Sequence, residues 1–255
     1  MVLTDMEQLE AWIDESDNIV FFGGAGVSTE SGIPDFRSVD GLYHQKYDYP
    51  PETILSHSFY QKKPEEFYRF YWDKMICLDA KPNQAHIALA KLEQQGKLKA
   101  IITQNIDGLH QMAGSSEVLE LHGSVHRNYC ERCGKFYSLE DILPFSATQN
   151  EDGTSRTPKE RVPICSCGGR IKPDVVLYEE GLDNDTLTKA VSYIRNADIL
   201  IIGGTSLAVY PAAGLIDYYR GERLVVINLS QTPRDTYADL VIAGKIGQVL
   251  AEVVK

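Results

Sequence analysis

Four cysteines stand in two close pairs and are of a type and spacing that bind a metal. Cys130 and Cys133 are separated by two residues, and Cys165 and Cys167 follow after a gap of 31 residues. Four thiolates suit a closed tetrahedral zinc site that leaves no position open for catalysis. We therefore predict a structural zinc holding a small module, and we expect the tight C-x-C spacing of the second pair to strain the chelate only slightly.

The fifth cysteine, Cys77, stands apart in the segment YWDKMICL. Free cysteines behave as small apolar side chains and are often buried. We expect Cys77 to be a buried helix residue without a chemical role.

A glycine turn, Gly24-Ala25-Gly26, follows a short apolar segment. Such a turn lets the backbone approach a pyrophosphate at a helix N-terminus. The sixth position of the usual G-x-G-x-x-G pattern is Thr29, so the dinucleotide fingerprint is incomplete. Taken alone, these residues are equally consistent with a tight turn that binds nothing.

His122 is a candidate general base. An unperturbed imidazole titrates near pH 6.5, so at neutral pH it can take a proton from a hydroxyl group. The chain has five other histidines, and a lone histidine is more often a surface or core residue. The nearest rival, His110, reads as part of a helix that follows the loop from Gln104 to Asp107.

Longer motifs resemble those of the sirtuin family, in its bacterial form. They are GAGVSTESGIPDFR (24–37), TQNIDGLH (103–110), LHGS (121–124) and GTSL (204–207). They occur in the family's order and extend the resemblance from about Asn18 to Gly247. The resemblance implies an NAD-dependent protein lysine deacylase that acts on acyl-lysine segments of proteins or peptides.

The reaction that the resemblance implies uses NAD as a co-substrate. The acyl oxygen of the substrate lysine attacks the nicotinamide ribose carbon, and nicotinamide departs from a pocket beside Phe36, Ile106 and Asp107. His122 then activates a ribose hydroxyl, while Asn105 orders the ribose and a water molecule. Free lysine and an O-acyl-ADP-ribose are the products, so His122 and Asn105 are the predicted catalytic residues.

The same resemblance implies which residues contact NAD and which contact the peptide. The NAD-binding residues are Gly24, Ala25, Gly26, Thr29, Asp35, Phe36, Arg37, Gln104, Ile106, Asp107, Gly204, Thr205, Ser206, Asn228, Ser230 and Ile246. The peptide is expected to pair by its main chain with a segment that contains Val175, Val176 and Tyr178. Taken alone, that segment is equally an ordinary buried strand.

Two departures from the family bear on substrate choice. Tyr178-Glu179-Glu180 stands where the family usually has Phe-Gly-Glu, so a further carboxylate lies beside the expected peptide site. Relatives that prefer acidic acyl groups have a Tyr-x-x-Arg pair, whose arginine binds the distal carboxylate. Neither Tyr68 nor Tyr71 has an arginine three residues later, and Lys74 is only a loose substitute. We expect acetyl and other neutral acyl groups.

Three other functions are alternatives to deacylation. A protein ADP-ribosyltransferase is the main alternative, but such relatives commonly lose the histidine that here is His122. A non-catalytic NAD sensor predicts damage at Asn105, Asp107 or His122, and all three are intact. An NAD(H) oxidoreductase would need the full glycine fingerprint and an acidic ribose reader, and it would leave the cysteines unexplained.

The elements that must position these residues are apolar strands with polar loops at their ends. The predicted strands are Asn18 to Phe22, Leu98 to Thr103, Ile199 to Ile202 and Leu224 to Ile227, and helices are expected at Ala85 to Gln95 and Thr186 to Asn196. Continuous apolar strands alternating with helices indicate a parallel sheet covered on both faces, with its ligand crevice at the carboxyl ends.

The predicted fold is therefore α/β, a Rossmann-like doubly wound parallel sheet with a smaller inserted zinc-ribbon and helical domain. Residues 1–37, 83–124 and 174–255 are assigned to the NAD-binding domain. Residues 38–82 are assigned to a helical insertion with a cofactor-binding loop, and 125–173 to the zinc-binding module, in which residues 146–161 read as an exposed loop.

Composition limits the partners. A net charge of −11 argues against nucleic-acid binding, which needs a basic surface. No apolar run approaches the ~20 residues of a membrane span, and the first ten residues are acidic and amphipathic rather than signal-like. We expect a cytoplasmic monomer that binds neither nucleic acid nor membrane.

Overall fold

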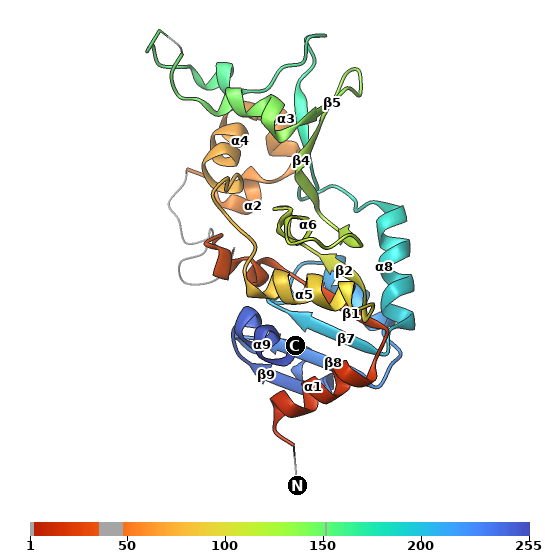
Figure 1. Cartoon of the computed structure of the whole chain (residues 1–255). Helices are drawn as coiled ribbons and strands as arrows, with labels where there is room; N and C mark the ends of the chain where they lie inside the picture. Colours follow the sequence, from red (N-terminus) through yellow and green to blue (C-terminus); the bar gives the residue numbers. More distant parts are fainter. Residues whose placement is uncertain (1–2, 36–47, 151) are drawn as a thin grey trace.

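The computed structural model describes residues 3–35, 48–150 and 152–255, which form a large lower lobe and a smaller upper lobe (Figure 1). Phe36 and Arg37, both predicted to contact NAD, lie outside the described residues. In the described parts of the chain no helix is long and apolar enough to cross a membrane.

The large lobe is built on a six-stranded sheet in which every pair of neighbouring strands is parallel. Its order is β3-β2-β1-β7-β8-β9. The strands are β1 (Ile19–Gly23), β2 (Leu98–Thr103), β3 (Val118–Glu120), β7 (Ile199–Gly203), β8 (Arg223–Asn228) and β9 (Leu240–Ala243). The chain runs outward from β1 to β3 and then returns to β7 on the other side of β1, so the switch point of a doubly wound sheet lies between β1 and β7. The predicted fold class is confirmed.

Helices cover both faces of this sheet. On one face lie α1 (Asp5–Glu15), α5 (Gln84–Gln94) and α9 (Ile246–Val253), and on the other lie α8 (Asn184–Asn196) and the 3-10 helix η7 (Ala212–Tyr218). Strand β1 supplies both cores, because alternate side chains of a strand point to opposite faces. Phe21 packs in the first core and Phe22 in the second, and both are fully buried.

Local sequence signals explain where the predicted helices begin. The side chain of Asn83 accepts a hydrogen bond from the Ala85 amide, so α5 starts at Gln84, one residue before the prediction. Asp183 caps α8 by accepting from the Thr186 amide. The predicted helix from Thr186 therefore starts two residues earlier, at Asn184.

The small lobe combines a three-stranded antiparallel sheet with the helical insertion. The sheet has the order β5-β4-β6, with β4 (Gly123–Cys130), β5 (Phe136–Ser138) and β6 (Ile171–Val175). The helices are α2 (Pro51–Ile54), α3 (His57–Lys62), α4 (Pro64–Phe70), which continues as a π-helical turn (Tyr71–Met75), and α7 (Leu139–Ile142). Short 3-10 turns at Leu143–Ser146 and Pro158–Arg161 follow α7.

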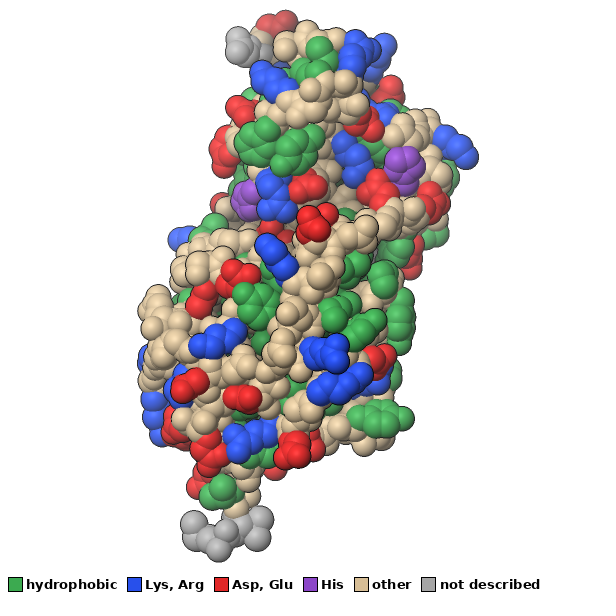
Figure 2. Space-filling model, turned by 90° about the vertical axis from the view of Figure 1, so that its right-hand side faces the viewer, with side chains coloured by type: hydrophobic (Ala, Val, Ile, Leu, Met, Phe, Trp, Pro, Cys, Tyr) green, Lys and Arg blue, Asp and Glu red, His purple; other side chains and the backbone are tan. Residues whose placement is uncertain are grey.

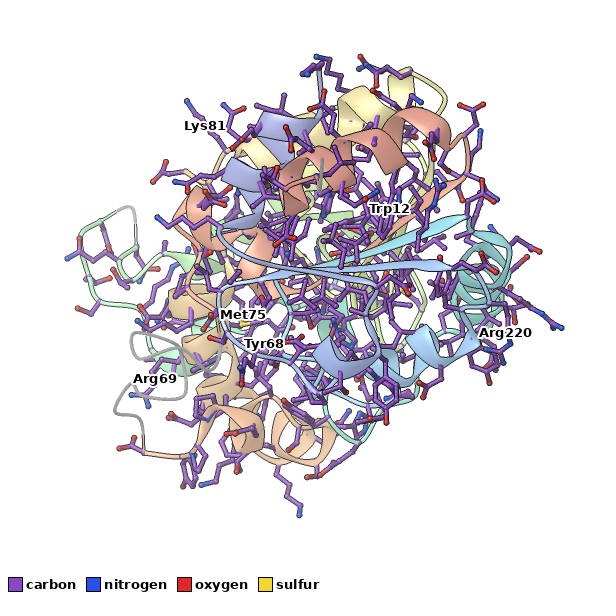
Figure 3. All side chains as sticks on the ribbon, turned by 90° about the horizontal axis from the view of Figure 1, so that it is seen from below. Trp12, Tyr68, Arg69, Met75, Lys81 and Arg220 are labelled. Carbon is purple, nitrogen blue, oxygen red and sulfur yellow. The ribbon has the colours of Figure 1, made fainter. Side chains whose placement is uncertain are left out.

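One aromatic core joins the insertion to the sheet. Phe67, Tyr68 and Tyr71 of the insertion pack with Val125 and Ile171 of the sheet. Figure 3 shows the two faces of α4, with Tyr68 in the interior and its neighbour Arg69 at the outside. The predicted domain boundaries stay a prediction, but residues assigned to the second and third segments share this core.

The surface carries charges of both signs. On the face shown in Figure 2, acidic and basic side chains are interspersed over both lobes. The net negative charge of the chain is therefore not gathered into one patch on this face.

Candidate active site

Polar loops from the carboxyl ends of the strands meet at one large cavity between the lobes. The cavity has a volume of about 1060 Å³. Every described residue that was predicted to be catalytic, NAD-binding or peptide-binding lines it. They are Gly24, Ala25, Gly26, Thr29, Asp35, Gln104, Asn105, Ile106, Asp107, His122, Val175, Val176, Tyr178, Gly204, Thr205, Ser206, Asn228, Ser230 and Ile246.

The glycine turn after β1 packs directly against the loop after β7. The Gly26 amide donates to the Gly204 carbonyl at 2.8 Å. A Cβ atom on Gly26 would lie 2.8 Å from the Gly204 backbone, so no larger residue fits without moving one of the two loops. The turn continues as two 3-10 helices, Ala25–Val27 and Thr29–Ser31. The predicted helix N-terminus is therefore a 3-10 turn rather than an α-helix.

Side chains from α5 and from the turn itself hold this segment in place. The side-chain Nδ2 of Asn83, the residue before α5, donates to the Val27 carbonyl at 2.8 Å and to Ser31 Oγ at 2.9 Å. Glu30 accepts from the Gly247 amide in the first turn of α9 at 2.8 Å. The segment predicted to approach the NAD phosphates is thus fixed by both helices that flank it.

A buried hydroxyl links the glycine turn to the loop after β2. Ser28 is 1% exposed; its Oγ donates to Asp107 Oδ2 at 2.6 Å and accepts from Asn105 Nδ2 at 3.0 Å. The other oxygen of Asp107 accepts from the Leu109 amide at 2.9 Å. Ser28 has no role predicted from the sequence, although it lies inside the Gly24–Arg37 motif, because only the fold brings it to Asn105 and Asp107.

His122 lies in the cavity wall with one ring nitrogen held by the backbone. Its Nδ1 is 3.0 Å from the Gln104 carbonyl oxygen, which can only accept, so Nδ1 carries the proton. The lone pair is then on Nε2, as a general base requires. Burial lowers the pKa of His122 below 6.5, and the bond to Gln104 opposes this effect only in part. The ring is therefore neutral at physiological pH.

The backbone beside His122 joins the two lobes. Gly123 follows at once and starts β4, and a Cβ atom there would lie 1.8 Å from the Asp174 carbonyl oxygen of β6. Arg127 of β4 binds Glu120 of the large sheet at 2.7 Å and Asp174 at 2.8 Å. These contacts fix the position of His122 at the junction of the lobes.

His110, the rival candidate, lies elsewhere. It belongs to the short helix α6 (Leu109–Met112), as predicted, and is 1% exposed. Its ring packs against that of His86 with centroids 4.7 Å apart. His110 does not line the large cavity.

Tyr68 and Tyr71, the tyrosines that bear on acyl recognition, do not line the cavity. Tyr68 and Tyr71 are buried in the small-lobe core, and the Tyr68 hydroxyl donates to the Ile171 carbonyl. Lys74 does line the cavity, and it pairs with Asp73 at 3.2 Å.

The prediction for Cys77 is wrong. Cys77 is exposed and lies just after the π-helical turn, in a loop that lines the large cavity. The helix ends at Met75, two residues before Cys77. Burial and the nearby Asp107 carboxylate together raise the pKa of its thiol.

The other four cysteines lie together in the small lobe, within reach of one ion. All four Sγ atoms are within 4.8 Å of one another. The Cys130–Cys167 and Cys133–Cys165 sulfurs are 3.5 and 3.7 Å apart. Tetrahedral zinc with bonds of about 2.3 Å places its sulfurs about 3.8 Å apart, so the cluster fits zinc. The Tyr137 hydroxyl donates to Cys165 Sγ at 3.1 Å, the kind of outer contact that orients a ligand.

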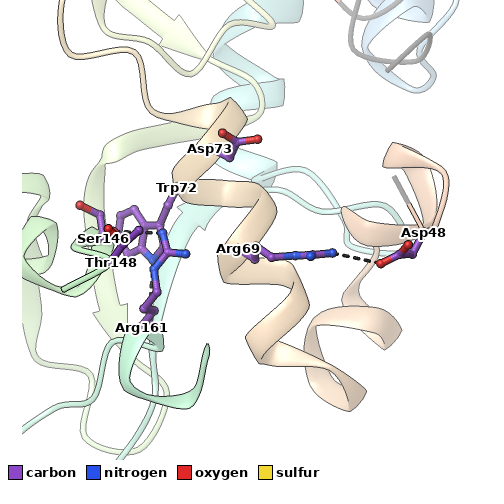
Figure 4. Close-up of a pocket in the computed structure, with 7 residues that line it drawn as sticks. All are labelled: Asp48, Arg69, Trp72, Asp73, Ser146, Thr148 and Arg161. Carbon is purple, nitrogen blue, oxygen red and sulfur yellow. Dashed lines mark hydrogen bonds and ion pairs between the residues drawn. The ribbon is translucent and has the colours of Figure 1, made fainter. Parts of the chain in front are cut away.

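A second cavity of about 510 Å³ lies at the outer side of the small lobe (Figure 4). None of the predicted site residues lines it. Arg69 in its wall is already paired with Asp48, and the Trp72 indole donates to the Arg161 carbonyl. We assign no chemistry to this cavity.

Comparison with known proteins agrees with this geometry. A family model described as the Sir2 family matches residues 24–211. A protein of Clostridium acetobutylicum named NAD-dependent protein deacetylase is 56% identical over 257 residues, which cover all of both chains. One from Clostridium tetani with the same name is 58% identical over 98% of this chain and 97% of its own.

Similar solved structures contain the expected ligands. A Sir2 protein with a p53 peptide and NAD⁺ is 40% identical and has a TM-score of 0.84, covering 97% of this chain and 96% of its own. A Sir2 variant with a deacetylated p53 peptide and 3′-O-acetyl-ADP-ribose is 40% identical with a TM-score of 0.86, covering 98% and 97%.

Proposed function

The chain belongs to the Sir2 family, and we propose that it removes acetyl and other short acyl groups from protein lysines with NAD as co-substrate. Nicotinamide and O-acyl-ADP-ribose are the further products. The family match and the full-length relatives named as deacetylases support this reaction.

The observation that carries the proposal is the state and position of His122. The ring is neutral, has its lone pair on Nε2, and shares a cavity with the glycine turn and with Asn105 and Asp107. A transferase or a sensor has no need of a base held in this tautomer. A deacylase needs one, because a ribose hydroxyl must lose a proton at neutral pH.

The chain's own residues divide the work of the reaction. The bound dinucleotide supplies an electrophilic ribose carbon and a leaving group. We infer that Asp107, held by Ser28, binds the nicotinamide carboxamide and that Asn105 orients the ribose and a water molecule. His122 takes the hydroxyl proton on Nε2, while the walls between the lobes exclude bulk water. Phe36 and Arg37 keep the roles that the resemblance implies.

The cysteine cluster supplies structure rather than chemistry. Cys130, Cys133, Cys165 and Cys167 would complete the coordination of a zinc ion, which leaves no position for substrate. The ion would hold β4 and the segment that leads into β6, and so the strand beside His122.

The preferred acyl group is small and neutral. Tyr68 and Tyr71 are buried in the small-lobe core and do not line the cavity. Two described lysines line it, Lys74 and Lys245, and Lys74 is paired with Asp73. No pair of groups in that wall matches the Tyr-x-x-Arg arrangement that binds an acidic acyl chain. A monomeric state, a cytoplasmic location and the absence of nucleic-acid binding stay predictions from charge and composition.

The proposal is tested with purified protein and an acetyl-lysine peptide, with and without NAD, followed by mass spectrometry. We expect the peptide to lose one acetyl group, a mass of about 42 Da, only when NAD is present. Nicotinamide and O-acetyl-ADP-ribose should form at the same time. The His122→Ala variant should lose this activity while still binding NAD.

Other outcomes separate the alternatives. Gain of ADP-ribose on the peptide would support a transferase. NAD binding with neither change, for acetyl and for longer acyl peptides, would support a non-catalytic sensor.

A further inference from the structure

Glu179 has a backbone conformation that residues with a side chain rarely adopt. Its φ is +76°, in the left-handed region, where a Cβ atom is crowded by the following carbonyl oxygen. Among the described non-glycine residues only Leu207 shares a positive φ. Glycine would adopt this conformation without strain, so a glutamate here calls for a compensating contact.

The Glu179 carboxylate makes that contact with the helical insertion. Its Oε2 accepts from the Ser58 amide at 2.8 Å, and its Oε1 accepts from Ser58 Oγ at 3.0 Å. Ser58 lies in the first turn of α3, where backbone amides have no partner within the helix. Both oxygens are therefore used by one residue of another element, 121 positions away in the chain.

Further bonds extend this contact into a clasp between residues 55–58 and 178–180. The Tyr178 amide donates to the Leu55 carbonyl at 3.0 Å, and the His57 amide donates to the Tyr178 carbonyl at 2.9 Å. Glu180 accepts from the Leu177 amide at 2.8 Å and pairs with His57 at 2.8 Å and with Lys172 at 3.1 Å. The turn at 178–180 is thus bonded on both sides.

The clasp adjoins the segment that takes the peptide in the proposed function. Val175, Val176 and Tyr178 line the cavity, and the Val176 amide donates to the His122 carbonyl at 3.0 Å. The segment is therefore fixed at one end by the His122 loop and at the other by the clasp. None of the bonds of Glu179 reaches the glycine turn or the loops after β2, β7 and β8.

We propose that Glu179 is a positioning residue for the peptide substrate. By binding Ser58 it fixes the peptide-pairing segment, residues 175–178, before the peptide arrives, so that binding does not have to order the segment. This inference rests on the proposed function, and it assigns Glu179 to peptide affinity and not to NAD affinity or to the chemical step.

Two substitutions separate the carboxylate from the backbone. Glu179→Gly removes the carboxylate and relieves the strained conformation, whereas Glu179→Ala removes the carboxylate and keeps the Cβ atom. Both should raise KM for an acetyl-lysine peptide by about three- to tenfold, which is less than the full energy of hydrogen bonds to a charged group because the contact acts on the peptide only by ordering the segment. KM for NAD and kcat should change by less than about twofold. Glu179→Gln, which keeps one acceptor oxygen, should restore part of the peptide affinity.

Ser58 provides the matched partner. Ser58→Ala removes only the hydroxyl bond and should raise the peptide KM less than Glu179→Gly does. The double variant should be no worse than Glu179→Gly alone, because the two residues act through one contact. Circular dichroism checks that each variant is folded.

Clear results would overturn the inference. An unchanged peptide KM in both Glu179→Gly and Glu179→Ala, or an equal rise in KM for NAD, would exclude a role specific to the peptide. If the wild-type protein does not deacetylate, the proposed function fails, and fluorescence anisotropy with a labelled acetyl-lysine peptide still tests Glu179. A rise in Kd of the same size supports the inference, and equal Kd values overturn it.

Discussion

The two lobes are held together in different ways. The large lobe buries aliphatic residues on both faces of a parallel sheet, and its strands read IVFFG and ILIIG. The small lobe has a three-stranded sheet in which β5 and β6 each pair with β4 over only a few residues. Its aromatic core is shared by two distant parts of the chain. The first can be stabilised by apolar burial alone, whereas the second has too little regular structure for that and adds a metal site.

The active site depends on this difference because it uses both lobes. Leu121 packs in a core of the large lobe, and Gly123 already belongs to the small sheet, so His122 lies at the boundary. The NAD-binding loops are set by the rigid sheet. The position of the base and of the peptide segment depends on the lobe that needs the metal.

Removing the metal should have the largest effect. Replacing Cys165 with serine, or treating the protein with a chelator, should unfold the small lobe and abolish activity, since structural zinc contributes about 10–16 kcal/mol in zinc-finger peptides. The large lobe should stay folded. The two tryptophans report on the lobes separately, because Trp12 packs beside the large-lobe core and Trp72 lies in the small-lobe core. After metal removal, the fluorescence of the Trp12→Phe variant, which keeps Trp72, should show unfolding. The fluorescence of the Trp72→Phe variant, which keeps Trp12, should not change.

Zinc content and a control complete this test. Elemental analysis should find one zinc per chain in the wild type and none in Cys165→Ser. Cys77→Ser should keep its zinc, because Cys77 lies outside the cluster. Loss of the Trp12 signal together with that of Trp72 would show that the lobes do not fold independently.

Removing the base should have the next largest effect, on chemistry alone. His122→Asn can still donate to the Gln104 carbonyl but cannot accept a proton at neutral pH, so kcat should fall about 10²- to 10⁴-fold. Melting temperature should change little. Since burial lowers the pKa of His122 and only the neutral ring acts as a base, wild-type kcat/KM should rise with pH, with a midpoint below pH 6.5. A midpoint above 6.5 would contradict the assignment.

The contrast between the lobes also explains what the sequence could predict. The apolar strands and the polar loops at their ends are local signals, and they located β1, β2, β7 and β8 and the edge of the sheet where the cavity lies, whereas the individual residues that line the cavity were predicted from the resemblance. Strand β3 has three residues and exists because β2 offers it a partner. Such a strand has no signal of its own.

Contacts between distant segments were beyond the sequence. Cys77 was expected in a helix because its neighbours are apolar, but the fold ends the helix at Met75 and exposes the thiol. Ser28 and Glu179 acquire partners 79 and 121 positions away. Phe36 and Arg37 rest on the resemblance alone.

A smaller effect is expected inside the NAD site, at Ser28. Ser28→Ala removes a buried hydroxyl bonded to Asp107 and Asn105, and hydrogen bonds to a charged group contribute about 1.5–3 kcal/mol. We expect kcat/KM for NAD to fall about 10- to 150-fold. Ser31→Ala, which loses one bond to Asn83, is the matched control and should lose less than about tenfold. Equal losses in the two variants would mean that Ser28 only supports the turn.

The smallest expected effect is on the stability of the large lobe in acid, and it comes from two buried histidines of that lobe. His86 and His110 are 0% and 1% exposed, and burial is the main cause that lowers the pKa of each ring below 6.5. Within the described part of the chain, neither ring nitrogen of His110 has a hydrogen-bond partner. Both rings are therefore neutral in the folded protein at pH values where the unfolded chain binds protons.

This difference in proton binding predicts how acid affects the large lobe. Below pH 6.5 the unfolded state takes up a proton at each histidine and the folded state does not. The free energy of unfolding therefore decreases as the pH decreases. The slope is about 1.4 kcal/mol per pH unit for each histidine, and it ends below the lowered folded-state pKa values. Urea unfolding of the Trp72→Phe variant, followed by Trp12 fluorescence between pH 7.5 and about 5, measures this slope. His110→Leu should lower the slope by the share of one histidine, about 1.4 kcal/mol per pH unit, because leucine does not titrate, whereas His86 and His122 still contribute. An unchanged slope in His110→Leu would mean that acid destabilises the large lobe through other groups. The buried histidines would then add nothing to the pH dependence of a core that is stabilised by apolar burial.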